Sequence, residues 1–275
     1  MERIKSVTRP VATGLGILLA AVATGYLLLV AVYTLPPSGM EASARSAAAV
    51  LQAEGKYPEG IPGWKQTVSD NFTDALMLDT AVFDARWGGK EGTVWAQAAD
   101  NNRYQRAGDD DKFDDFIADL ANPASAQTME AVSYARYWNG YLVFLKPLMS
   151  VMDYRAIRWL NGCFEGILLI GVIGGLMHRK KAAFLPAFLL GVVCLTPTVV
   201  WKSLQYASVI NVTLVVINLL LWQRQAREHL PLIFFIAGIL TNYFDLLTFP
   251  LLSLGFPLVF VLILREEKTS FKDTF

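Results

Sequence analysis

Long apolar runs separated by short polar segments dominate this chain, and they are concentrated in its second half. A helix needs about 20 predominantly apolar residues to cross the hydrocarbon layer of a bilayer. The pattern predicts six such spans, the last of them short and interrupted by Pro257. We therefore expect an all-α integral membrane protein with about six transmembrane helices. The predicted spans are Val11–Leu35, Cys163–Met177, Ala182–Val200, Ser203–Trp222, Leu230–Phe249 and Leu251–Leu264.

The stretch between the first two spans has a different pattern. Segments with helical spacing alternate with segments that contain Pro and Gly, which predicts a large helical loop. Tyr141–Val151 is apolar but too short to span, so we expect a helix in the membrane interface or one that dips back into the bundle. The other predicted elements are helices at Glu41–Gln52, Ser69–Phe83, Lys112–Leu120 and Ser125–Trp138, a loop at Gly55–Gly63 and a turn at Trp87–Lys90.

Basic residues predict the orientation. If the six spans alternate, four basic clusters fall on one side, whereas the short loops of the other side hold only Lys202. The positive-inside rule then places both termini in the cytoplasm. The predicted organisation is a cytoplasmic N-terminus with the first span (1–35), an external membrane-associated helical domain (36–162), a five-helix bundle (163–264) and a cytoplasmic tail (265–275). The clusters are Arg3/Lys5/Arg9, Arg179/Lys180/Lys181, Arg224/Arg227 and Arg265/Lys268/Lys272.

Composition excludes several classes of function. Residues 36–162 carry 17 Asp and Glu against 12 Lys and Arg, so this domain is mildly acidic and no nucleic-acid partner is expected. The two cysteines, Cys163 and Cys194, lie in predicted spans and give no disulfide framework. His178 and His229 lie in cytoplasmic loops, which excludes a histidine-ligated metal or a Ser-His-Asp triad on the external face. Nucleotide motifs are missing. We expect neither a metal nor another cofactor.

Carboxylates inside apolar segments are the first candidates for function, because an ionisable group at membrane depth costs roughly 2.5–3.5 kcal/mol on insertion scales. Asp245 lies near the end of the fifth span. Helical spacing would place it on one polar stripe with Thr241, Asn242 and Thr248. The alternative is an aspartate at a helix end that reaches the interface. Glu165 in the second span is a further costly charge.

Two aspartates of the external domain are candidates for a general base. Asp74 has apolar neighbours in the predicted helix Ser69–Phe83, so partial burial and a raised pKa are expected there. Asp79 follows on the same helix, and Asn71 precedes both. A water-facing side of the helix is the alternative. The acidic run Asp109–Asp115 lacks the order of an EF-hand, and we interpret it as a solvated helix start.

Cations near the outer interface are candidates for binding a phosphate. Arg136 lies beside Tyr137 and Trp138, Lys146 lies within the short apolar segment, and Arg158 immediately precedes the second span. Arg offers two parallel hydrogen bonds to a phosphate. The alternative is that these side chains reach the phospholipid headgroups without a specific ligand. Gln205, in the stretch 201–206 that joins the third and fourth spans at the outer face, adds an amide.

Four runs of the sequence carry a resemblance. Residues 69–78, 134–148, 203–206 and 241–251 resemble those of a family of uncharacterised bacterial polytopic membrane proteins, and the similarity covers most of the chain. It implies the inner membrane of a bacterium, with the large loop external or periplasmic. More coarsely, a first span, a large external loop and a helical bundle are similar in topology to the C-class (GT-C) glycosyltransferases. Those enzymes use polyprenyl-phosphate-sugar donors, and an acidic residue of the first external loop serves as the base.

This likeness implies transfer of a sugar from a polyprenyl-phosphate-linked donor to an acceptor in the cell envelope. Asp74 or Asp79 would be the catalytic base, and Arg136, Lys146 and Arg158 would hold the donor phosphate. The remaining candidates for substrate binding are Asn71, Gln205, Asn242 and Asp245. A non-catalytic protein that binds or transports a membrane lipid is the alternative hypothesis. An accessory subunit that docks onto partner membrane proteins is a third.

Overall fold

The computed structural model describes residues 2–83, 93–106, 112–122, 124 and 128–265. Most of the described chain is helical, and the one sheet within it has two strands of three residues each, so the all-α prediction is confirmed. The chain divides into two compact units. The N-terminal unit comprises Met1–Tyr57 and Asp70–Ile157, and the bundle unit comprises Pro58–Ser69 and Arg158–Phe275. Each unit is described by itself.

The N-terminal unit is built around the helix α3 (Asn71–Val82), which packs against α2, α5 and α6. Asp70 caps α3, because its side chain accepts a hydrogen bond from the Thr73 backbone N–H at 3.1 Å. Apolar side chains of the four helices, such as Leu51, Leu78 and Phe116, are fully buried. The elements of this unit are α1 (Glu2–Tyr33), η1 (Pro37–Met40), α2 (Glu41–Glu54), α3, α4 (Val94–Asp100), β1 (Arg103–Gln105), α5 (Phe113–Ala121), β2 (Glu130–Val132) and α6 (Leu142–Val151).

The predicted helices at 41–52, 69–83, 112–120 and 141–151 are confirmed as α2, α3, α5 and α6. The helix predicted at Ser125–Trp138 is wrong. Residues 130–132 instead form β2, which pairs antiparallel with β1 and places Tyr104 opposite Ala131. The spacing of apolar residues in the predicted segment favours a helix. Pairing of β2 with β1, a strand that is distant in sequence, overrides this local preference. The predicted turn at Trp87–Lys90 and the acidic residues Asp109–Asp111 lie outside the described residues.

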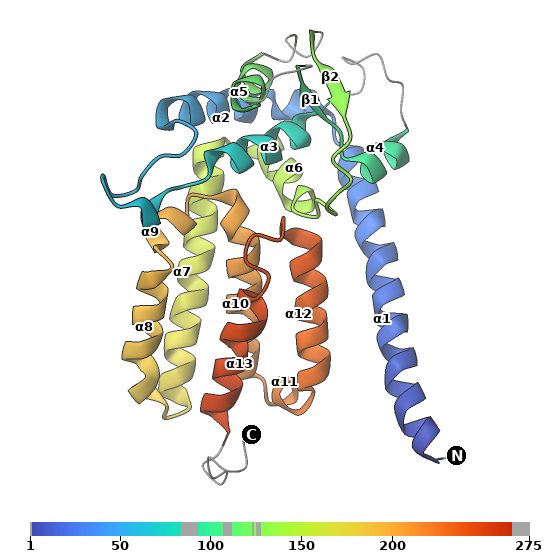
Figure 1. Ribbon diagram of the computed structural model, residues 1–275, viewed down its shortest axis with the longest axis vertical. Helices are drawn as coiled ribbons and strands as arrows, with labels where there is room; N and C mark the ends of the chain where they lie inside the picture. The colour runs from blue at the N-terminus through green and yellow to red at the C-terminus, as the bar shows by residue number, and fades with distance from the viewer. Residues whose placement is uncertain (1, 84–92, 107–111, 123, 125–127, 266–275) are drawn as a thin grey trace. The chain divides into compact units, whose positions relative to one another are not determined.

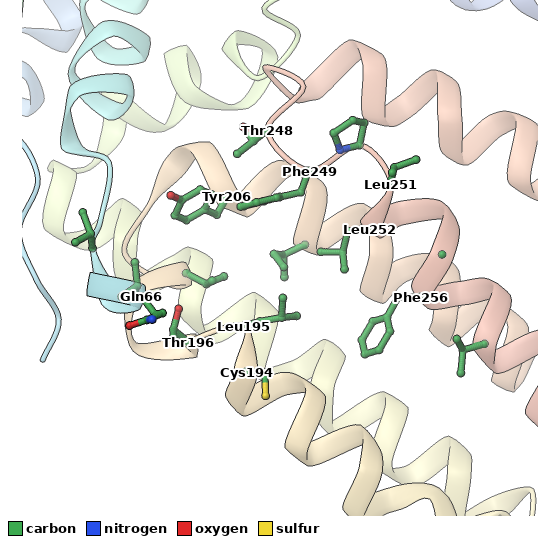
Figure 2. A pocket seen from close by; sticks show the side chains of 17 residues that line it. Gln66, Cys194, Leu195, Thr196, Tyr206, Thr248, Phe249, Leu251, Leu252 and Phe256 are labelled. Carbon is green, nitrogen blue, oxygen red and sulfur yellow. The ribbon is translucent and has the colours of Figure 1, made fainter. Parts of the chain in front are cut away.

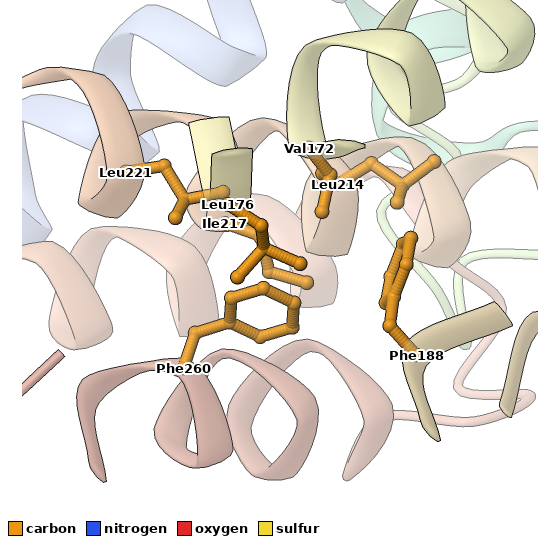
Figure 3. Packing of buried hydrophobic residues seen from close by; sticks show 7 residues of the cluster. All are labelled: Val172, Leu176, Phe188, Leu214, Ile217, Leu221 and Phe260. Carbon is orange, nitrogen blue, oxygen red and sulfur yellow. The ribbon is translucent and has the colours of Figure 1, made fainter. Parts of the chain in front are cut away.

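The bundle unit is organised by α10, which packs against α12 and α13. Val172 and Leu176 of α7 meet Phe188 of α8, Ile217 of α10 and Phe260 of α13 in one buried cluster (Figure 3). The elements are η2 (Lys65–Thr67), α7 (Tyr154–His178, whose first turn belongs to the N-terminal unit), η4 (Ala182–Phe184), α8 (Leu185–Cys194), α9 (Pro197–Val200), α10 (Leu204–Trp222), α11 (Arg224–Glu228), α12 (Leu230–Phe244) and α13 (Leu252–Leu264) (Figure 1).

Among the described residues, three helices are long and apolar enough to cross a membrane. They are Val11–Tyr33, Tyr154–His178 and Leu204–Trp222, and α8, α12 and α13 are shorter apolar helices. The predicted span 182–200 is not one helix, because Thr196 has a φ of 49° and Pro197 begins a new helix, α9. The predicted span 230–249 ends early: α12 stops at Phe244, and Leu247 has a φ of 58°.

Gly175 permits a close approach of α7 to α10. A Cβ atom at this position would lie 2.8 Å from Cβ of Leu221. We therefore expect Gly175→Ala to destabilise the bundle unit by about 1–3 kcal/mol, the usual cost of overpacking. The matched control is Gly166→Ala in the same helix, where a Cβ meets nothing within 4 Å. Thermal unfolding of the two variants in detergent micelles tests this, and equal melting temperatures would contradict the close approach.

Candidate functional site

A cavity of about 810 Å³ lies within the bundle unit (Figure 2). Its walls come from the end of α8, from α9, α10 and α13, from the connection that precedes α13, and from η2. Apolar side chains predominate, and the polar ones are few. The apolar lining residues are Val68, Leu195, Val199, Val200, Ile210, Phe249, Pro250, Leu251, Leu252, Gly255, Phe256 and Val259, and the others are Gln66, Cys194, Thr196, Tyr206 and Thr248.

Two breaks in helices shape the cavity. The left-handed conformation of Thr196 turns the chain between α8 and α9, so Cys194, Leu195 and Thr196 all line the cavity. The second break, after Phe244, frees the chain to form the wall from Thr248 to Leu251. Both are positions at which sequence periodicity predicted an unbroken span. Figure 2 shows Thr196 and Gln66 at one end of the cavity and Phe256 at the other.

The segment 58–69 supplies an additional wall. The Thr67 hydroxyl holds this segment in a tight loop, because it accepts from the Ile61 N–H at 2.9 Å and donates to the Trp64 carbonyl at 2.7 Å. Gln66 and Val68 thereby line the cavity. The sequence predicts only a loop, at Gly55–Gly63, in this part of the chain. No periodic signal marks a loop residue as part of a binding site, so this contribution was not predictable.

Two of the predicted binding residues, Gln205 and Asp245, both contact Thr248, which lines the cavity. The Gln205 side-chain amide donates to the Thr248 hydroxyl at 3.0 Å, and the Thr248 N–H donates to the Asp245 carboxylate at 2.8 Å. Asp245 is buried, with 2% of its surface exposed, and it ends α12. The predicted polar stripe is therefore wrong in part, because Thr248 lies beyond the helix. Thr241 instead contacts Ser253 at 2.7 Å, and Asn242 is exposed on α12.

Asp74 is completely buried in the N-terminal unit. Its carboxylate accepts a hydrogen bond from the Tyr154 hydroxyl at 3.0 Å, and 0% of its surface is exposed. The expected burial is confirmed and is greater than expected. Asn71, at the start of the same helix, is also fully buried, and its amide donates to the Gly55 carbonyl at 2.9 Å and to Glu54 at 3.1 Å. These contacts hold α3 against the end of α2.

Asp79 forms a buried carboxyl pair with Asp119 of α5. Their exposed fractions are 0% and 3%, and the two carboxyl groups lie close enough for a hydrogen bond between them. Two carboxyls make this bond only when one of them carries a proton. Burial and the neighbouring carboxyl hold the pKa of Asp79 well above its usual range, although the N–H of Tyr104 and the charge of Arg103 oppose this shift. Burial raises the pKa of Asp119 to about 6.

Lys146 is buried within the N-terminal unit. Its ammonium donates to the Ala81 carbonyl at 2.6 Å and lies 4.9 Å from the centroid of the Tyr33 ring. Only 1% of Lys146 is exposed, so a phosphate has no access to it in this conformation. Arg136 is exposed and lies over the ring of Tyr137, and Arg158 is a buried residue of the bundle unit. The three predicted phosphate ligands therefore have three different environments.

The chemistry of the two units differs. Asp74, Asp79 and Lys146 form the polar interior of the N-terminal unit, whereas the cavity of the bundle unit is mostly apolar with polar groups along part of its wall. Among the described residues, no three His, Cys, Asp or Glu side chains are grouped so that they would hold a metal ion. The cavity therefore suits a hydrocarbon ligand that also has a polar group.

Comparisons with known proteins do not add a family. No protein-family model matches the chain, and no curated protein or solved structure is significantly similar to it. The resemblance suggested by the four sequence runs therefore stays a prediction.

Proposed function

We propose that this protein binds a membrane lipid and that the cavity of the bundle unit encloses part of the lipid's hydrocarbon chain. The observation that carries the proposal is the cavity itself, about 810 Å³ with a mostly apolar wall. Ligand sites of about 300–1,000 Å³ bury most of a small ligand's surface. An apolar cavity of this size can hold a hydrocarbon chain, whether the chain comes from the bilayer or from a carrier.

Polar groups on the wall would select the lipid. A chain that leaves the bilayer exchanges one apolar environment for another, so its burial contributes little to affinity. Specificity then depends on hydrogen bonds to the headgroup or linker. Thr196, Tyr206 and Gln66 line the cavity, and Thr248 is held there by Gln205 and Asp245. Gln205 and Asp245 thus act by positioning Thr248.

We also propose that the chain has six segments in the membrane. Three helices are long enough to cross alone, and we infer that α8 with α9, α12 and α13 complete the bundle as shorter segments. The arrangement then has six membrane segments with the basic clusters on the cytoplasmic side, as the positive-inside rule requires. Residues 36–162 would be the external domain of a protein of the bacterial inner membrane.

Sugar transfer from a polyprenyl-phosphate donor stays a prediction without structural support. A general base must come within about 3 Å of the hydroxyl that it deprotonates. Asp74 and Asp79 have no exposed surface, so neither can reach an acceptor hydroxyl in this conformation. Lipid binding therefore agrees better with the geometry than catalysis does.

Cys194 provides an internal probe of the cavity, because it is exposed and lines the wall. In a Cys163→Ser background, we expect a palmitoyl lysolipid to slow maleimide labelling of Cys194 about tenfold, equivalent to about 1.4 kcal/mol of protection. The measurement is the labelling rate in micelles by mass spectrometry. Cys163, exposed but outside the lining, is the control in a Cys194→Ser background. Equal slowing of both thiols would speak against specific binding.

A further inference from the structure

Glu165 lines a second cavity within the bundle unit. It lies in α7, its exposed fraction is 6%, and the cavity measures about 40 Å³. That volume holds roughly one to three water molecules or one group of similar size. The second cavity shares wall residues with the larger one, so the two adjoin. The shared residues are Leu195, Val200, Ile210, Leu252 and Phe256.

Hydrogen-bond acceptors outnumber donors around Glu165. Its carboxylate accepts from the Asn161 amide at 3.1 Å, and the same amide also donates to the Trp201 carbonyl at 3.2 Å. The Asn161 carbonyl accepts from Asn211 at 3.1 Å. The Asn211 side-chain oxygen is buried and has no hydrogen-bond partner among the described residues. Both N–H groups of the Asn161 amide are thus used, whereas the carboxylate of Glu165 still has acceptor capacity.

The described residues provide no cation for Glu165. Its side chain contacts the Asn161 amide, and no cation among the described residues contributes to its electrostatics. A carboxylate in an apolar segment is costly unless it is paired or protonated. A ligand that brings both a positive charge and N–H donors would satisfy the Glu165 carboxylate, which lines the small cavity.

We infer that the ligand of the large cavity carries a protonated amine, which binds Glu165 in the small cavity. This inference rests on the proposed lipid-binding function and names the chemical class of the ligand. An ammonium has three N–H donors and no acceptor, which complements this site. A divalent cation fits poorly, because Ca²⁺ takes six to eight oxygen ligands and Mg²⁺ is octahedral.

Two matched amphiphiles test the inference. We expect the purified full chain in nanodiscs to bind dodecylamine about tenfold more tightly than dodecanol at neutral pH, a difference of about 1.4 kcal/mol. Protection of Cys194 from alkylation measures both affinities. Glu165→Gln should bind the two probes with equal affinity, because Gln is neutral and keeps an oxygen for the Asn161 amide. Glu228→Gln, a change at an exposed residue of α11, should keep the preference.

The outcomes separate the two proposals. If dodecanol binds the wild type but dodecylamine gains nothing, or if Glu165→Gln keeps the preference, the amine site is overturned while lipid binding stands. If neither probe protects Cys194, lipid binding fails and the amine site fails with it. Nanodiscs of phosphatidylethanolamine or phosphatidylcholine distinguish the sources of the amine. If dodecylamine binds more weakly in nanodiscs of phosphatidylethanolamine than in those of phosphatidylcholine, the amine comes from a lipid headgroup. If neither lipid competes with dodecylamine, the amine comes from a free ligand.

Discussion

Replacing Asp79 by Asn is expected to stabilise the protein at about pH 8 by about 2 kcal/mol and to reduce the dependence of its stability on pH. The reason is the buried pair with Asp119. Asn stays neutral, its amide N–H₂ can donate to the Asp119 carboxylate, and its oxygen still accepts the Tyr104 N–H that Asp79 accepts at 3.2 Å. The change therefore removes a charge penalty without removing the contacts of the pair.

The direction of the pH dependence follows from the raised pKa values. Asp119 has a pKa of about 6 in the folded protein against 3.8 for an ordinary aspartate, and the pKa of Asp79 is shifted in the same direction. From about pH 4 upward the unfolded chain ionises before the folded one, so folding stability is greatest at acid pH. The contribution of Asp119 is lost between about pH 4 and pH 6, and stability continues to fall until Asp79 also ionises in the folded protein.

Urea unfolding between about pH 5 and pH 8, followed by fluorescence, measures this effect. Asp114→Asn is the matched control, because Asp114 lies on the same helix as Asp119 but is exposed. We expect the control to unfold as the wild type does at every pH. If Asp79→Asn were less stable than the wild type at about pH 8, the ionised carboxylate would be required for the fold, and the shared-proton interpretation would be wrong.

Gly255→Phe is expected to weaken lipid binding more than tenfold, which corresponds to more than about 1.4 kcal/mol. Gly255 lines the cavity, and a Cβ at this position meets nothing within 4 Å. A phenyl ring would therefore occupy the space meant for the hydrocarbon chain without displacing a helix. The affinity for a fluorescent acyl lipid, measured in nanodiscs, reports the loss.

Gly238→Phe provides the matched control. Gly238 lies in α12, its Cβ would also meet nothing within 4 Å, and it does not line the cavity. We expect this variant to bind lipid as the wild type does. An equal loss in both variants would show that added bulk disturbs the bundle in general, and no loss in Gly255→Phe would place the ligand elsewhere.

The helical character of this chain was predictable because it depends on local pattern. The spacing of apolar residues and the capping aspartate identified α3, and the uninterrupted run at 204–222 identified α10. The two strands were not predictable, since three residues carry too little periodic signal. Thr196 and Leu247 were missed for another reason: neither is a glycine, so their left-handed backbone conformation has no sequence signature.

The candidate site was predictable only in part. Apolar surroundings correctly suggested that Asp74 is buried, but they do not distinguish a catalytic carboxylate from one that holds the interior together. Asp79 was predicted as a general base without its partner being recognised. Asp119 lies 40 residues later in the sequence and pairs with Asp79 only through tertiary packing. Glu165 was noticed as a costly charge. Its amide partners, Asn161 and Asn211, needed the packing of α7 and α10 to be known.

The most direct test of lipid binding is an experimental structure of the protein in a lipid bilayer. We expect an elongated density within the cavity, along Leu195, Leu252 and Phe256, with its polar end near Thr196, Tyr206 or Glu165. The same structure of Gly255→Phe should lack this density. A wild-type cavity that is filled by its own side chains, or that holds only water, would contradict the proposal.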